Sequence, residues 1–530
     1  MDIKLINLPL PINAGFMAQY GLEMLEAYLL QQGHRVKLVD AQIEDIGVED
    51  IVEEISDSNL KNELVGISAL PSSISLLEEV LSKLNSKVSF NKKTPLVIGG
   101  YIVTHYADSI FNLEGGSLVD AIVFGKGEEA LGKIVSSYQN SSNLSDISNI
   151  SFQNEGEVYT TPRSPVNIIN LPWSTRSLSL RLKEKSQSDL SVLRIYKSAG
   201  CLNFCSFCNI HDYIYADRTL GKEETKKQLW VTRTPEDVVN EVVFLHEKFG
   251  TKTFDFVDDD ALGSSPEDWL KISNLLDDAG ISDEIEYWIS AKLMKFAESK
   301  EVIRRMSDSG LMGIFLGFES PTYRVLKELN KAATIDGRSF SSEQEYLGAF
   351  HESIELAKDL GLKLKLGNIN ILADSTFEEV KSSIQFICDN DILYNVESVI
   401  RPIGIFGDTL IKRKYQRKGY IKATSVNDDW QNNVRFCYNF KDPQVNDLFN
   451  YWQSYNVPTF LFRMDLLRRT YLQKDGSKEM IYFKKLRDID FTVAEGIIQA
   501  INNDGPSIDG IISGSIEKVK RLEEEFYERF

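Results

Sequence analysis

The sequence predicts an α/β protein with three parts: a doubly wound parallel sheet, a partial (β/α)6 barrel and a mainly helical C-terminal domain. Short apolar runs alternate with amphipathic runs early in the chain and again in its middle, which is typical of parallel sheets. After about residue 410 only helical periodicity continues. We expect domains over residues 1–140, 191–410 and 411–530, with a hairpin and linker over residues 141–190.

The composition is that of an ordinary folded protein, with 42% hydrophobic and 26% charged residues in a 530-residue chain. A net charge of −19 argues against a nucleic-acid-binding surface, which needs basic patches. The one basic run, residues 412–418, is expected to be a solvated helix face. No window approaches the run of about 18 apolar residues that a membrane span needs. Five cysteines form no disulfide framework, and together with an N-terminus that resembles a strand they predict a reducing cytoplasm.

The first part is expected to place glycine-rich loops along one edge of its sheet. The predicted strands are residues 3–8, 36–40, 64–68, 95–98 and 121–124, with helices at 20–32 and 74–84. Loops at the carboxyl ends of such strands form a ligand crevice, and glycines allow the backbone to approach a ligand closely. Each loop alone is an ordinary turn, so we interpret them only as a set. The loop residues are Ser68, Gly99, Gly100, Gly125, Gly127 and Glu128.

A cysteine-rich loop follows the predicted strand 192–196. Cys201, Cys205 and Cys208 have C-x3-C-x2-C spacing, so their thiolates can converge on one metal centre. A four-iron cubane is normally held by four cysteines, and three would leave one iron open to a substrate or cofactor. Two alternatives remain open at this point. Cys205 and Cys208 could form a redox dithiol, or His211 could complete a tetrahedral zinc site.

The pattern in the middle of the chain predicts six strands that alternate with helices. These strands are residues 192–196, 253–257, 285–290, 312–316, 364–372 and 396–402. A helix over residues 235–249 has proline at its start and Gly250 at its end. The second strand runs into Asp258, Asp259 and Asp260, and adjacent carboxylates repel one another unless a cation lies nearby. The long insertion 209–234 is a candidate substrate lid.

Two motifs of the barrel resemble a known family. The cysteine spacing, with the aromatic Phe207 before the third cysteine, resembles the signature of radical S-adenosylmethionine (SAM) enzymes. The stretch 317–320, Gly-Phe-Glu-Ser, resembles the family's G-x-E-S. Asp40 and the glycine loops of the first part resemble the cobalamin-binding domain that precedes the barrel in one large subfamily. The resemblance implies a 4Fe–4S cluster, SAM on its open iron, a 5′-deoxyadenosyl radical, and cobalamin.

The resemblance also implies roles for particular residues. Cys201, Cys205 and Cys208 would be the catalytic cluster ligands, and the glycine-loop residues named above would contact cobalamin. The implied SAM contacts are Phe207, Asp258, Asp259, Ser290, Lys292, Glu319 and Asn370. Two departures stand out. No D-x-H-x-x-G motif supplies an axial histidine, so cobalamin would bind without a protein imidazole, or the domain has lost it. The turn 373–376 also lacks the glycines and proline usual after strand five.

The activity that the resemblance implies is methyl transfer to an unactivated carbon of a small-molecule or peptide substrate. The electron would come from a donor such as flavodoxin or ferredoxin. One alternative is cyclisation, rearrangement or epimerisation, with the cobalamin domain auxiliary or empty; another is a zinc-bound sensor with no catalysis. Cys388, in an apolar run, is expected in the core, whereas Cys437 is either a buried small side chain or a radical hydrogen donor.

Overall fold

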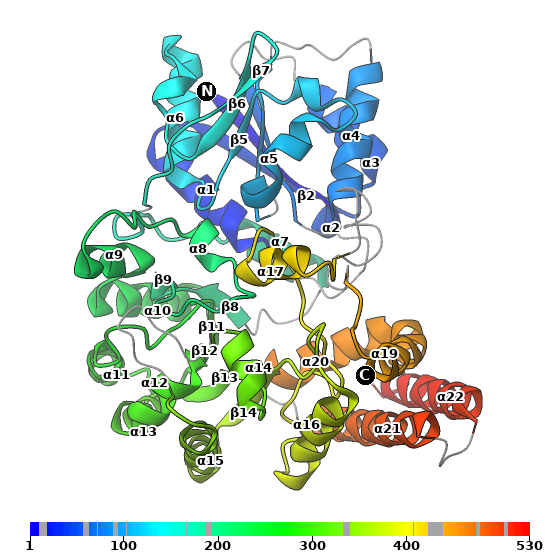
Figure 1. Ribbon diagram of the computed structural model, residues 1–530. Helices are drawn as coiled ribbons and strands as arrows, with labels where there is room; N and C mark the ends of the chain where they lie inside the picture. The colour runs from blue at the N-terminus through cyan, green and yellow to red at the C-terminus, as the bar shows by residue number, and fades with distance from the viewer. Residues whose placement is uncertain are drawn as a thin grey trace.

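We describe a computed structural model of the chain (Figure 1). It describes residues 1–9, 18–56, 63–70, 73–87, 94–101, 103–165, 167–186, 192–331, 340–405, 407–421, 438–472, 477–502 and 507–529. Cys437 lies outside the described residues. In the part of the chain that is described, we find no helix whose length and hydropathy together would let it span a bilayer.

The first sheet has seven strands in the order β2-β1-β3-β4-β5-β6-β7. Its parallel strands are β1 (Asp2–Asn7), β2 (Arg35–Asp40), β3 (Glu63–Ser68), β4 (Leu96–Gly99) and β5 (Ala121–Val123). One apolar cluster packs α1 (Tyr20–Gln31) and α6 (Glu128–Asn140) on one face. A second packs α3 (Val48–Ser56), α4 (Ile74–Ser86) and α5 (Val103–Phe111) on the other. Helices on both faces confirm the doubly wound fold predicted from the alternating pattern.

A hairpin extends this sheet beyond its parallel strands. β6 (Ile150–Asn154) and β7 (Glu157–Thr160) pair antiparallel with each other, and β6 pairs antiparallel with β5. The hairpin expected within residues 141–190 is confirmed, whereas its pairing with β5 was not expected. Ile150 and Phe152 are buried against the same apolar cluster as α6, so the hairpin covers an edge of the sheet that would otherwise be open.

The second sheet is the incomplete barrel, in the order β14-β13-β12-β11-β8, all parallel. Its strands are β8 (Val192–Ile195), β11 (Thr253–Phe256), β12 (Glu286–Lys292), β13 (Leu311–Glu319) and β14 (Lys363–Asn368). The helices between them are α10 (Pro235–Phe249), α11 (Asp268–Asp278), α12 (Leu293–Glu298), α13 (Lys300–Ser307), α14 (Tyr323–Glu328) and α15 (Glu343–Asp359); α16 (Phe377–Asp389) follows β14.

The predicted sixth strand, residues 396–402, is not a continuous strand. It meets the β14 region through two isolated parallel bridges, Leu366–Val396 and Ile371–Pro402. Side chains replace part of the missing ladder, because the amides of Asn368 and Asn370 donate to the carbonyls of Ser398 and Val399 at 2.8 and 2.6 Å. The segment therefore occupies the sixth position of the barrel while its own backbone stays irregular.

The insertion 209–234, predicted as a loop, contains regular structure. It holds α8 (Ile210–Tyr213), α9 (Lys222–Leu229) and β10 (Trp230–Thr232). β10 pairs antiparallel with β9 (Ser198–Gly200), the short strand that leads into the cysteine loop. The insertion thus supports the cysteine loop from one side.

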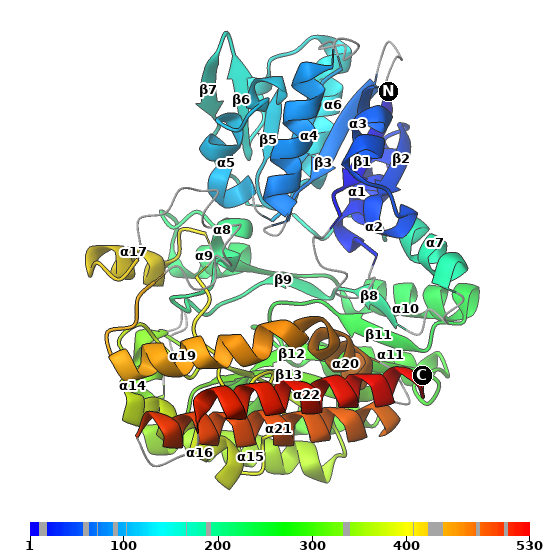
Figure 2. The same ribbon diagram turned by 90° about the vertical axis from the view of Figure 1, so that its right-hand side faces the viewer.

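Four helices after the barrel confirm the predicted helical C-terminal part. They are α19 (Pro443–Asn456), α20 (Phe460–Leu472), α21 (Ser477–Ile501) and α22 (Ile508–Tyr527). Their apolar side chains belong to the same buried cluster as the barrel strands, and they lie across the barrel in Figure 2. A smaller helix, α17 (Leu410–Arg417), lies apart from them, between the barrel and the first domain (Figure 1).

A buried ionic cluster joins the two sheets through the linker, which also contains α7 (Ser177–Ser186). Arg176, 1% exposed, donates to Glu241 of α10 at 2.7 Å and to the carbonyl oxygen of Arg194 in β8. Arg233 donates to the other oxygen of Glu241 at 2.7 Å. The guanidinium of Arg176 also lies 5.2 Å from the ring centre of Tyr20, at the start of α1. The linker is therefore held tightly on both sides.

Candidate active site

The cysteine loop begins at a position that only glycine can occupy. Gly200 has φ +92°, and a Cβ there would lie 2.0 Å from the carbonyl oxygen of Leu229. Downstream, the residues that follow α14 hold the loop: Ser206 N donates to Leu329 O at 2.7 Å, and the Asn330 side-chain amide donates to Phe204 O at 2.7 Å. The loop is thus fixed at its entry and along its length.

The three thiols of the loop share one electrostatic environment. Cys201 and Cys205 are buried, and Cys208 is exposed. Burial raises the pKa of Cys201 to about 12. Burial alone would lower the pKa of Lys292, yet the three thiols and Asp260 raise that pKa well above its ordinary value. Lys292 also lines a pocket with Leu202 and Asn203 of the cysteine loop, so it lies close enough to offset the negative charge of a thiolate-bound group.

The zinc alternative receives no support from the arrangement of side chains. Among the described residues, no three His, Cys, Asp or Glu side chains converge closely enough to hold a single metal ion. His211 is turned to Phe204, with ring centres 4.4 Å apart, and burial lowers its pKa to about 4. A cubane differs from a single ion, because its irons are spread and its ligands can stand further apart. Three thiols on one loop, with Lys292 nearby, fit that group.

The three carboxylates after β11 have different roles. Asp258 is fully buried and accepts from Lys197 N at 3.0 Å and from both the backbone and the hydroxyl of Ser198. Burial raises its pKa to about 6. Asp259 accepts from Gly200 N at 2.9 Å. Both aspartates therefore hold β9, the strand that delivers Cys201.

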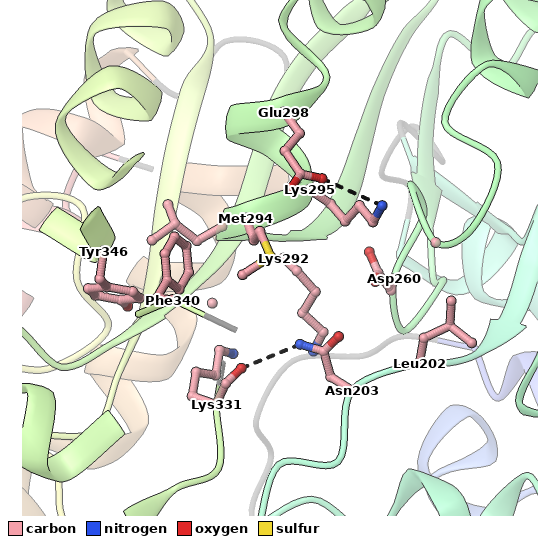
Figure 3. A pocket seen from close by; sticks show the side chains of 13 residues that line it. Leu202, Asn203, Asp260, Lys292, Met294, Lys295, Glu298, Lys331, Phe340 and Tyr346 are labelled. Carbon is pink, nitrogen blue, oxygen red and sulfur yellow. Dashed lines mark hydrogen bonds and ion pairs between the residues drawn. The ribbon is translucent and has the colours of Figure 1, made fainter. Parts of the chain in front are cut away.

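Asp260 is the carboxylate that faces the pocket. It is 2% exposed, and its Oδ1 has no hydrogen-bond partner among the described residues. It lines a pocket with Lys292 beside the cysteine loop (Figure 3). The predicted SAM contacts are Asp258 and Asp259, and Asp260 has no predicted role. A buried carboxylate oxygen without a partner is what a cationic ligand group would satisfy.

The pocket lies between the cysteine loop and the carboxyl ends of β12 and β13. In Figure 3, Asn203 and Lys331 lie at one end, Lys295 and Glu298 at the other, and Lys292 between them. The complete lining is Leu202, Asn203, Asp260, Gly263, Lys292, Leu293, Met294, Lys295, Glu298, Gly317, Lys331, Phe340 and Tyr346. Cationic and anionic groups thus alternate with apolar ones around a single space.

Glu319 is held by an ion pair that the sequence does not predict. It ends β13 with φ +66°, and its Oε1 lies 2.6 Å from Lys331 Nζ. A Cβ on Gly317 would lie 2.4 Å from the same nitrogen, so the G-x-E-S glycine makes room for the lysine. No local signal in the sequence joins Lys331 to Glu319, because a whole helix separates them.

The other predicted SAM contacts lie in different settings. Ser290 is half-buried in β12, and its carbonyl accepts from Ala261 N at 2.9 Å. Phe207 packs on an apolar cluster that includes Ile369. The side chain of Asn370 donates to Val399 O at 2.6 Å and accepts from Arg401 N at 2.8 Å. Asn370 therefore fastens the sixth segment of the barrel and lies outside the pocket lining.

The glycine loops of the first sheet face the barrel. Ser68 and Gly99 lie opposite each other in register at the ends of β3 and β4. Gly100 has φ +106° and packs on the backbone of Ala69. Glu128 is buried at the start of α6, and its Oε2 has no hydrogen-bond partner among the described residues. Close backbone approach and an unsatisfied polar atom fit a large polar cofactor at this edge.

This edge also contacts the segment that follows the third cysteine. The Tyr101 hydroxyl donates to the side chain of Asn209, the residue after Cys208, and a Cβ on Gly125 would lie 2.4 Å from Tyr213 O. Gly127, in the same loop, packs near Val123. The predicted cobalamin loops and the cysteine loop are therefore neighbours in space, although about 75 residues separate them in the chain.

Comparison with protein families identifies two domains in the chain. Residues 14–135 match the B12 binding domain, and residues 195–387 match the Radical SAM superfamily. An uncharacterized methyltransferase, PH0819, of Pyrococcus horikoshii is 25% identical over 71% of this chain and 74% of that protein. The anaerobic magnesium-protoporphyrin IX monomethyl ester cyclase of Synechocystis is 22% identical over 63% of this chain and 64% of that protein. The hopanoid C-3 methylase of Methylococcus capsulatus is 22% identical over 69% and 62%.

Solved structures share the architecture. The cobalamin-dependent SAM radical enzyme OxsB, with aqua-cobalamin and SAM bound, has a TM-score of 0.74 at 16% identity and covers 100% of this chain and 80% of its own. The radical SAM methyltransferase TsrM of Kitasatospora setae has a TM-score of 0.59 at 14% identity, covering 80% and 77%. The fold of the whole chain is therefore that of a B12-binding domain joined to a radical SAM barrel.

Proposed function

The chain belongs to the cobalamin-dependent radical SAM enzymes, and we propose that it transfers a methyl group to an unactivated carbon of a small-molecule or peptide substrate. The observation that carries the proposal is the contact between the two halves of the site: the glycine loops of the B12-binding domain meet the segment after Cys208. When bound, the 4Fe–4S cluster with SAM supplies a 5′-deoxyadenosyl radical, and cobalamin supplies the methyl group. Both cofactors would then border one space.

The residues of the chain bind and position these groups. Cys201, Cys205 and Cys208 would hold the cluster, and Lys292 would offset its charge. Asp260, with its unsatisfied oxygen, suits the SAM ammonium group better than Asp258, whose oxygens already hold β9. Glu319 remains our choice for the ribose, with Lys331 fixing its carboxylate. The remaining predicted SAM contacts would act less directly, through the strands and loops that they support. They are Phe207, Asp259, Ser290 and Asn370.

At the edge of the first domain, the backbone of the glycine loops would contact the corrinoid, and Glu128 would accept a hydrogen bond from it. The loop residues are Ser68, Gly99, Gly100, Gly125 and Gly127.

We keep the domain division 1–140, 141–190, 191–410 and 411–530 as a proposal, with the hairpin assigned to the first sheet. A reductant such as flavodoxin or ferredoxin would supply the electron. An oxygen-sensitive cluster would be best protected in the cytoplasm.

Deuterated SAM tests the proposal without knowledge of the substrate. The protein is expressed with cobalamin, purified without oxygen, reduced, and incubated with SAM that carries a CD3 group. We expect 5′-deoxyadenosine and a corrinoid labelled with CD3, both measured by mass spectrometry. Cys201→Ser should abolish the deoxyadenosine, whereas Cys388→Ser, a matched change at an exposed cysteine, should not. A protein that retains no corrinoid under these conditions would exclude the methyl-transfer proposal.

A second candidate is ring formation without methyl transfer, because two of the related proteins are magnesium-protoporphyrin IX monomethyl ester cyclases. The same labelled SAM separates the two reactions once a substrate is found. Methylation adds the CD3 mass to the product, and cyclisation leaves the label on SAM-derived compounds.

A further inference from the structure

The basic run of the sequence forms a helix directly beside the cysteine loop. Ile411 N, in the first turn of α17, donates to Ser206 O at 2.9 Å, and Ser206 lies between Cys205 and Cys208. Ile411 and Tyr415 are fully buried in the apolar cluster on which Phe207 packs. One face of α17 is therefore attached to the residue between two of the proposed cluster ligands, directly after Cys205 and two residues before Cys208.

The opposite face of α17 is exposed and basic. Leu410, Arg413 and Arg417 follow one another at helical spacing and are all exposed, Leu410 to 57%. Between residues 408 and 418 there are five basic side chains and one acidic one, in a chain whose net charge is −19. An exposed leucine followed by two arginines along one helix face has the composition of a small docking site.

Neighbouring acidic groups reduce this charge without removing it. Arg413 pairs with Asp408 at 2.6 Å, Lys418 with Asp374 at 3.2 Å, and Lys414 with Glu328. The Arg413–Asp408 pair is more than half exposed, so water screens it strongly. Lys412 lies 3.5 Å from the Tyr106 hydroxyl of the B12-binding domain. These contacts fix the helix in place and leave a net positive surface.

We propose that the exposed face of α17 is the docking surface for a small acidic one-electron carrier protein of the flavodoxin kind. The inference rests on the proposed function, because the carrier would reduce the cluster: it loses one electron, and the cluster gains it. Cys208 is exposed on the same loop, so the electron would enter where the cluster lies closest to solvent. On a protein of net negative charge, a basic patch attracts an acidic partner, and the remaining surface repels it.

The test measures reduction of the cluster-loaded full-length chain by stopped flow near 400 nm. Two reductants are compared: a reduced flavodoxin and the methyl viologen radical, a small cation that needs no docking surface. In R413E/R417E we expect the flavodoxin rate constant to fall at least tenfold at low salt, and the viologen rate constant to stay within twofold. The matched control, Lys518→Glu with Arg521→Glu, reverses two exposed charges on α22 and should change neither rate.

Two further measurements make the test decisive. For the wild-type chain, the flavodoxin rate should fall steeply as salt rises, and Leu410→Ser should lower it without changing the salt dependence. Equal flavodoxin rates in wild type and R413E/R417E, or a wild-type rate indifferent to salt, would overturn the docking surface. If viologen reduces the cluster but SAM is not cleaved, the proposed function fails instead, so the two failures are distinguishable.

Discussion

Replacing Lys331 by methionine tests the pocket most directly. The ammonium group lies 2.6 Å from Glu319 Oε1, and the two side chains are 6% and 10% exposed. Breaking a buried pair by removing one partner costs about 3–5 kcal/mol, because the remaining charge stays buried without compensation. Glu319 cannot readily turn to water, since it ends β13 with φ +66° and its carbonyl accepts from Ile369 N. We expect the barrel to lose about 3 kcal/mol of stability.

The same substitution should weaken SAM binding, because it releases the carboxylate that we assign to the ribose. A loss of about 3 kcal/mol corresponds to a dissociation constant raised about a hundredfold. Equilibrium dialysis of the cluster-loaded protein measures this constant. Guanidinium unfolding followed by tryptophan fluorescence measures the stability of the barrel, because all six tryptophans lie between residues 173 and 452.

Two variants make the result interpretable. The double variant Lys331→Met/Glu319→Gln should recover part of the lost stability, because no charge is left buried, while SAM binding stays weak. Lys327→Met, an exposed lysine on α14, should change stability by less than about 0.5 kcal/mol. If Lys331→Met unfolded at the wild-type denaturant concentration and bound SAM normally, the reasoning about this pair would be refuted.

Three more changes have defined outcomes. Gly200→Ala should prevent cluster loading, measured as iron per chain, because its Cβ would meet Leu229 O at 2.0 Å; normal iron content would contradict the steric argument. Asp258 has a folded-state pKa of about 6 against an ordinary 3.8, so its stabilising contribution is present below about pH 4 and lost as the pH rises through 6. The unfolding free energy of wild type minus that of Asp258→Asn should therefore fall by up to about 3 kcal/mol between pH 4 and 7 in denaturant titrations, and a flat difference would refute this. Cys388, exposed on α16, should be the first thiol of the described residues alkylated in cluster-loaded protein by peptide mass spectrometry; protection equal to that of Cys201 would show that it is buried.

The fold follows from the sequence most closely where structure is local. The alternation of strands and helices predicted both sheets, and Pro235 and Gly250 bound α10 as expected, with Gly250 at φ +68°. The β6–β7 hairpin was predicted, but its pairing with β5 was not, because pairing between distant segments leaves no local pattern. The irregular sixth segment was also missed, since nothing in residues 396–402 shows that asparagine side chains would replace ladder hydrogen bonds.

Two side chains show what spacing can and cannot reveal. Cys388 was predicted in the core because it follows an apolar run, yet it is exposed. Ile384 and Ile387 are on the buried face of α16, and Cys388, four residues after Ile384, lies on the same side by helical spacing. Cys388 is the second-last residue of the helix, and the local pattern does not show that its side chain is exposed. Asp260 is different. In a run of three identical residues, the sequence cannot tell which carboxylate faces the pocket and which two bind backbone.

The buried guanidinium of Arg176 sets a limit on how the enzyme can move. It bonds to α10 and β8, while Ser174 and Ser179 of the same segment donate to Glu23 of α1, so swinging the halves apart would break one of these two buried sets of hydrogen bonds. We therefore expect the two halves to stay together at this seam during turnover. Motion during the catalytic cycle would then be limited to bound ligands, side-chain rotations and the substrate, between two domains that keep their relative position.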